Sequence, residues 1–272
     1  GTLINSSTEG VGAGGFIALS ADMIRIDDGS ALESDSFSSG DGGEIILSAT
    51  SSFDLTNARI EAEALGSGAG GLVEIKSPEI TLGQDSEINI SALSGTGDGG
   101  VLTLAGTTIT AVDADIKGET FGEGKGADIA LTAEDITLTG TLINSSTEGV
   151  GAGGFIALSA DTISIDDGSA LESDSFSSGD GGDIILSATD SFDLTNARIE
   201  AEVLGSGAGG LVEIKAPEIT LGQDSEINIS ALRGSGNAGV LTLAGTTITA
   251  VDADIKGETF GEGKGADIAL TA

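Results

Sequence analysis

Carboxylates are the side chains of this sequence best suited to acid–base chemistry, because the chain contains no His and no Cys. Without them, no Ser–His or Cys–His pair can activate a nucleophile. Pairs of acids do occur, at Asp27–Asp28, at Asp113 with Asp115 and at Glu61 with Glu63. Carboxylate pairs hydrolyse glycosides, which leaves a polysaccharide-active enzyme as a remote alternative. Each pair returns 139 residues later, and repeated active sites are not typical of enzymes, so we expect no enzymatic activity.

Four carboxylates occupy matching positions in two successive repeat units and could together hold a metal ion. They are Glu33, Asp35, Glu61 and Glu63, with copies at Glu172, Asp174, Glu200 and Glu202. If the units stack, hard oxygen ligands meet in a square that suits weak binding of calcium. The alternative is a solvated acidic patch that tolerates a repulsion of roughly 0.8 kcal/mol per pair of charges about 5 Å apart in water. We favour the patch, keep calcium as a hypothesis, and expect no other cofactor.

Two short motifs admit a functional and a structural interpretation. Gly66-Ser-Gly-Ala-Gly-Gly71 has the spacing of a dinucleotide-binding loop, but a strand-like Leu72-Val-Glu-Ile-Lys follows where that loop requires a helix. We therefore interpret the glycines as a tight corner. Asn-x-Ser motifs resemble glycosylation sites, and whether they are modified is left open. They begin at Asn5, Asn89, Asn144 and Asn228.

The elements that position these residues follow from two nested repeats. Residues 1–133 return as residues 140–272 with ten differences, so the internal repeats are 1–139 and 140–272. Within a block, the pattern of Gly15-Phe-Ile-Ala-Leu recurs about every 28 residues, for example as Gly43-Glu-Ile-Ile-Leu. Repeats of this length indicate a solenoid or an array.

Each unit of about 28 residues predicts three short strands, because apolar and polar residues alternate with a period of two. Ile17 and Leu19, Ile24 and Ile26, and Leu32 carry the apolar positions of the first unit. A single coil cannot bury its apolar face, so neighbouring coils must supply the core. Crossovers between parallel strands are nearly always right-handed. We predict an all-β, right-handed parallel β-helix of about ten coils that runs continuously through residues 1–272.

The charge and composition restrict the partners. A formal net charge of −34 argues against binding to nucleic acid or to an anionic membrane surface. No apolar stretch approaches the length of a membrane span, and no signal peptide is present. We expect the chain to be a segment of a longer protein, with further copies of the same repeat as its neighbours.

The outward side of the first strand carries apolar residues, and exposed apolar surface often marks an interface. They are Phe16, Ile46, Leu72 and Val101, with Phe155 as a copy of Phe16. We expect either lateral self-association of chains there or a covering segment.

The stretch Gly29-Ser-Ala-Leu-Glu-Ser-Asp-Ser-Phe-Ser-Ser-Gly-Asp-Gly-Gly-Glu-Ile-Ile-Leu-Ser-Ala resembles the degenerate repeats of filamentous-haemagglutinin-type exoproteins. These are the secreted passengers of bacterial two-partner secretion. The resemblance implies an extracellular or cell-surface adhesin or fibre in which this segment is a rigid stalk. The alternative is a binding surface for a host or carbohydrate receptor, repeated along the rod.

Overall fold

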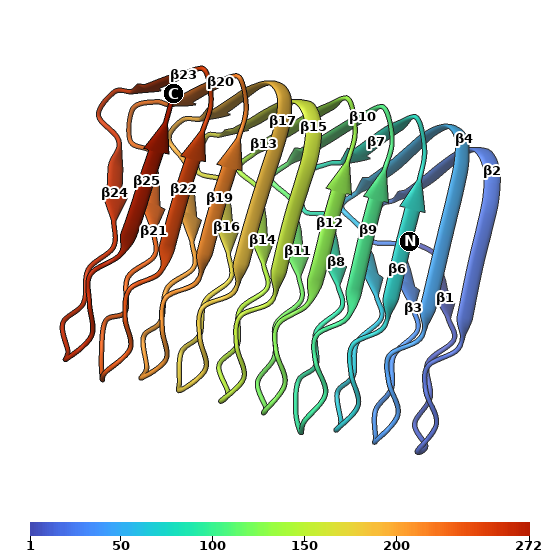
Figure 1. Cartoon of the computed structure of the whole chain (residues 1–272). Helices are drawn as coiled ribbons and strands as arrows, with labels where there is room; N and C mark the ends of the chain where they lie inside the picture. Colours follow the sequence, from blue (N-terminus) through green and yellow to red (C-terminus); the bar gives the residue numbers. More distant parts are fainter.

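Parallel strands account for all the regular secondary structure of residues 1–272 in the computed structural model (Figure 1). The chain winds into about ten coils of roughly 28 residues, which confirms the predicted parallel β-solenoid. No helix is present that is long and apolar enough to cross a bilayer.

One sheet contains a three-residue strand from each coil and holds ten strands in sequence order. They are β1 (Leu3–Asn5), β3 (Ala31–Glu33), β5 (Arg59–Glu61), β8 (Glu87–Asn89), β11 (Asp115–Lys117), β14 (Leu142–Asn144), β16 (Ala170–Glu172), β18 (Arg198–Glu200), β21 (Glu226–Asn228) and β24 (Asp254–Lys256). Here β14 pairs with β11 on one side and with β16 on the other, so the ladder runs across the junction of the two blocks.

The other sheet contains the first and second strands of each coil. Its members are β2 (Phe16–Asp27), β4 (Glu44–Thr56), β6 (Leu72–Lys76), β7 (Glu79–Leu82), β9 (Val101–Ala105), β10 (Thr108–Val112), β12 (Asp128–Thr132), β13 (Asp135–Thr139), β15 (Phe155–Asp166), β17 (Asp183–Leu194), β19 (Leu211–Lys215), β20 (Glu218–Leu221), β22 (Val240–Ala244), β23 (Thr247–Ala250) and β25 (Asp267–Thr271). In β2, β4, β15 and β17 the two strands expected from the sequence run together. They separate where Pro78 or Gly106 lies at the corner, because proline lacks an N–H group and glycine favours a bend. They also separate between β12 and β13, where Ala133 and Glu134 form the corner.

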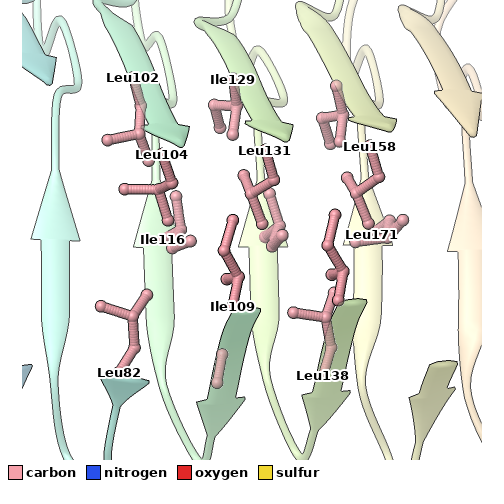
Figure 2. Close-up of a cluster of buried hydrophobic side chains, with 14 of the residues drawn as sticks. Leu82, Leu102, Leu104, Ile109, Ile116, Ile129, Leu131, Leu138, Leu158 and Leu171 are labelled. Atoms are coloured by element: carbon pink, nitrogen blue, oxygen red, sulfur yellow. The ribbon is translucent and has the colours of Figure 1, made fainter. Parts of the chain in front are cut away.

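Ladders of aliphatic side chains fill the interior (Figure 2). The shared place of Ile17, Ile45, Val73, Leu102, Ile129 and Ile156 in the repeat predicts one inward ladder. The structure confirms it, since each residue pairs with the next and none is more than 5% exposed. Burying one such side chain contributes about 1.5–3 kcal/mol. The ladder therefore stabilises each coil through its neighbours.

The corner before the ten-stranded sheet requires a left-handed backbone, which Asp and Asn tolerate better than most residues. Asp28, Asn57, Asp85 and Asp113 have φ values of +51°, +48°, +55° and +50°. Two of the acids considered above as catalytic pairs, Asp28 and Asp113, thus have a conformational reason to be there.

Glycine closes the base of the loops that project from one edge of the solenoid (Figure 1). The N–H of Gly43 donates to the carbonyl of Ser34 in the same coil. A Cβ atom at Gly43 would lie 2.3 Å from the carbonyl oxygen of Gly15 in the preceding coil. In one coil of each block the glycine is the other partner, because Ala127 faces Gly118 and Ala266 faces Gly257. One partner of each such pair must therefore be small.

Ser77 is an unsatisfied buried polar residue in the first block that has no counterpart in the second. Its hydroxyl is buried and has no hydrogen-bond partner, and its copy is Ala216. Because an unsatisfied buried hydroxyl costs about 1–3 kcal/mol, we expect Ser77→Ala to stabilise the chain and Ala216→Ser to destabilise it by a similar amount. Chemical denaturation measures both. The exposed Ser39→Ala is the control, and a loss of stability in Ser77→Ala would contradict the assignment.

Candidate functional site

The outer face of the ten-stranded sheet carries the acidic residues singled out from the sequence. Glu33 pairs with Glu61, Glu61 with Asn89, and Asn89 with Lys117, in one outward column. Oxygen atoms of Glu33, Asp35 and Glu61 lie within 4.8 Å of one another, while Glu63 is not part of this group. In the first block the structure thus brings together three of the four carboxylates proposed for calcium, whereas the four copies in the second block do not form such a group.

Arg59 changes the electrostatics of this group, and the sequence reasoning overlooked it. Its Nη2 atom lies 2.5 Å from Glu33 Oε1, and its Nε atom lies 2.9 Å from Glu61 Oε1. Arg198 makes the same contacts to Glu172 and Glu200 in the second block. The like charges predicted to repel are therefore bridged by a guanidinium group, although exposed ion pairs of this kind contribute only about 0–1 kcal/mol.

A second set of contacts explains why polar residues recur at the Asp35 position. The carbonyl of Ser6 turns inward to accept from Gly15 N–H, so it is lost to the next coil. The N–H of Asp35 then has no main-chain partner and donates to Ser7 Oγ at 2.9 Å. The N–H of Glu63, one coil further on, donates to Asp35 Oδ1 at 3.0 Å.

In all ten coils a side-chain oxygen accepts from the N–H group at this position, and we call this contact a cap. It accounts for the Asn-x-Ser motifs. The donor–acceptor pairs are Ser7–Asn5, Asp35–Ser7, Glu63–Asp35, Ser91–Asn89, Glu119–Ser91, Ser146–Asn144, Asp174–Ser146, Glu202–Asp174, Ser230–Asn228 and Glu258–Ser230. After Glu63, Glu119 and Glu202, the next coil uses an asparagine two residues before its serine. We infer that these asparagines restart the series of caps. Their modification by glycans stays a prediction.

Burial dominates the titration of the capping carboxylates. Asp174 is 5% exposed, and burial, opposed by its bond from Glu202 N–H, raises its pKa to about 8. Burial and the neighbouring Glu61 and Asp35 raise the pKa of Glu63 to about 7. Burial and the neighbouring Glu200 likewise raise the pKa of Glu202 to about 7. These three carboxyl groups are therefore mostly protonated below neutral pH.

The predicted lateral interface on the fifteen-stranded sheet is not one apolar column. Phe16 and Val101 are 59% and 43% exposed, and Leu72 lies between them in the same column. Glu44 separates Phe16 from Leu72, and Ile46 belongs to the next outward column, beside Glu74. Asp128 separates Val101 from Phe155. The apolar surface expected there is therefore interrupted by carboxylates.

Two hollows of the surface are small and polar. One of about 220 Å³ is lined by Asn57, Arg59, Asp85 and Glu87, among others, and the second block repeats it. It is open, and the left-handed corner supplies part of its wall. Such a hollow offers hydrogen bonds and charge but buries little of a ligand.

No family model, no curated protein and no solved structure matches this chain.

The raised pKa values predict that the protein is more stable in mild acid than at alkaline pH. The folded chain holds the Asp174 proton up to about pH 8, whereas the unfolded chain releases it near pH 3.8. Because the folded state binds more protons in this window, stability is fully present below it and falls as the pH rises through it. We expect a higher melting temperature at pH 5 than at pH 8.

Asp174→Asn with Glu202→Gln should shrink that difference in melting temperature, because neither amide side chain titrates. The Oδ1 atom of the asparagine can still accept from the N–H of residue 202, so the hydrogen bond is kept. Asp183→Asn with Glu218→Gln removes the same charge from exposed positions on the other sheet and should preserve it. Equal wild-type melting temperatures at the two pH values would show the carboxylates to be less perturbed than the structure indicates.

The calcium hypothesis and the solvated patch differ in their response to salt. Because Arg59 already bridges Glu33 and Glu61, we expect calcium chloride to shift the melting temperature no more than sodium chloride at equal ionic strength. Arg59→Gln with Arg198→Gln should add a calcium-specific rise, and Lys76→Gln with Lys215→Gln should not. A calcium-specific rise in the wild-type chain would favour the metal site instead.

Proposed function

We propose that this solenoid is a structural repeat segment of a secreted bacterial surface fibre or adhesin and serves as a rigid stalk. The observation that supports it best is continuity. Pairing between coils runs through all ten strands of one sheet, and the buried ladders cross the junction of the blocks without a linker. A rod of this kind holds whatever lies beyond it at a set distance.

The resemblance to filamentous-haemagglutinin-type repeats supports an extracellular or cell-surface location. It rests on the Gly-Ser-x-Leu strand, the small polar turn and the Gly-Gly-x-Ile-x-Leu strand, which here correspond to β3, the projecting loop and the start of β4. Membership of two-partner secretion exoproteins is part of the proposal.

Repeated binding along the rod is the second candidate. It is favoured by outward residues that recur identically in both blocks, since repeated sites raise avidity without new contacts. An enzymatic role has less support, because Asp28 and Asp113 serve backbone corners and Glu61 is paired with Arg59.

A stalk must lengthen in proportion to its repeats. A block of five coils at about 4.8 Å per coil should add roughly 24 Å. We expect chains with one or two additional 139-residue blocks inserted after residue 139 to show this increment in the maximum dimension by small-angle X-ray scattering. The cross-section should stay unchanged. A smaller increment, or a wider cross-section, would indicate bending or lateral packing and oppose the stalk.

A further inference from the structure

A column of apolar side chains runs along the base of the projecting loops, on the opposite edge of the acidic face from Arg59. Its phenylalanines are exposed and its leucines are half-buried. In each block it contains two phenylalanines with two leucines between them. The members are Phe37, Leu65, Leu93 and Phe121, and then Phe176, Leu204, Leu232 and Phe260. We call each group of four the loop ladder.

Hydrogen bonds show that the members are direct neighbours. The N–H of Leu65 donates to Ser36 O, and that of Leu93 donates to Ala64 O, each at 2.8 Å. The terminal phenylalanines Phe37 and Phe121 are 51% and 43% exposed. Unlike the outward column of Phe16, the loop ladder continues over four coils without a carboxylate. Contiguous exposed apolar surface of this kind marks interaction sites.

The loop ladder borders the acidic band of the same face. Phe37 follows Asp35 by two residues, and Leu65 follows Glu63 by two, so successive outward positions carry first the acids and then the apolar group. Arg59 is engaged by Glu33 and Glu61, and Asp35 is buried, which leaves Glu63 and Glu119 as the accessible carboxylates of this band without an ion pair. Burial is the main cause of the raised pKa of Glu63, and repulsion from Glu61 and Asp35 adds to it. A second copy of this chain, with its own net charge of −34, would add to that repulsion.

We propose that each loop ladder, with the acidic band beside it, is a docking surface for a cationic amphipathic helix of another polypeptide. The helix would lay one apolar stripe along the ladder and direct Lys or Arg side chains toward Glu63 and Glu119 in the first block. The dimensions agree, since a helix rises 5.4 Å per turn and coils repeat about every 4.8 Å. Four coils span roughly 14 Å, which corresponds to about ten helical residues. This proposal does not depend on the stalk function.

The repeat makes the surface bivalent in this chain. Glu148 occupies the equivalent position in the coil between the two ladders and separates them. Two helices on one partner could therefore bind one chain together, with the gain in avidity that linkage provides.

The test is fluorescence anisotropy of a labelled synthetic peptide of about 14 residues, with leucines at helical spacing on one face and lysines on its flanks, titrated with the full chain at about 0.15 M salt. Two further probes replace the leucines by serine or the lysines by glutamate. The proposal expects binding of the first probe only, because charge alone is largely screened at this salt.

The deciding variant is Phe37→Ser with Phe121→Ser, Phe176→Ser and Phe260→Ser, which should weaken binding about tenfold or more. Its matched control is Phe16→Ser with Val101→Ser, Phe155→Ser and Val240→Ser, also four exposed apolar residues, which should leave binding within about twofold. Melting curves establish that both variants fold. If the first does not, a photoreactive group in place of one leucine of the peptide should label the loop ladders of the wild-type chain.

Three results would overturn the proposal. The first is equal weakening of peptide binding by both fourfold variants, or photolabelling outside the loop ladders. The second is binding of the serine probe as tight as that of the leucine probe. The third is concentration-dependent self-association of the chain alone that the Phe37 variant abolishes. The last would identify a second copy as the occupant.

Discussion

Main-chain hydrogen bonding between successive coils is the constraint on which the rest of this structure depends. It holds each residue over its counterpart about 28 positions away and sets a coil spacing of about 4.8 Å. That spacing leaves no room for a Cβ atom at Gly43, which would meet the Gly15 carbonyl. It also decides which polar groups lose their main-chain partners, as the N–H of Asp35 does.

Stacking the same kind of side chain in successive coils stabilises the interior of the solenoid but would destabilise its surface. In the interior, Ile45 beside Ile17 and Val73 buries apolar surface on both sides, so similarity stabilises. On the surface, similarity would place carboxylate over carboxylate. The structure offsets this with guanidinium at Arg59, with uncharged Asn89 and with Lys117 in the same sheet. The residual acidity is accommodated by raised pKa values at the buried members.

The fold was predictable because every coil repeats the same two-residue alternation, and the period alone placed Ile17 over Ile45. Simple counting would also have placed Arg59 beside Glu33, and Ile46 two residues away from the column of Phe16. The caps were not predictable in this way. They depend on the Ser6 carbonyl turning inward to Gly15, which is a property of the closed coil and leaves no trace in hydropathy. The Asn-x-Ser motif is visible in the sequence, but its role follows only from that geometry.

The junction between the blocks has a further consequence for how such a chain can change in length. A coil of the second block rests on the first as coils within a block rest on one another. Removing any 139 consecutive residues from the repeated region would join a residue to a copy of its own former neighbour, so every column would still contain residues it already accommodates. Recombination between blocks would therefore lengthen or shorten the solenoid in whole steps of five coils, with every new contact between coils already present in the chain.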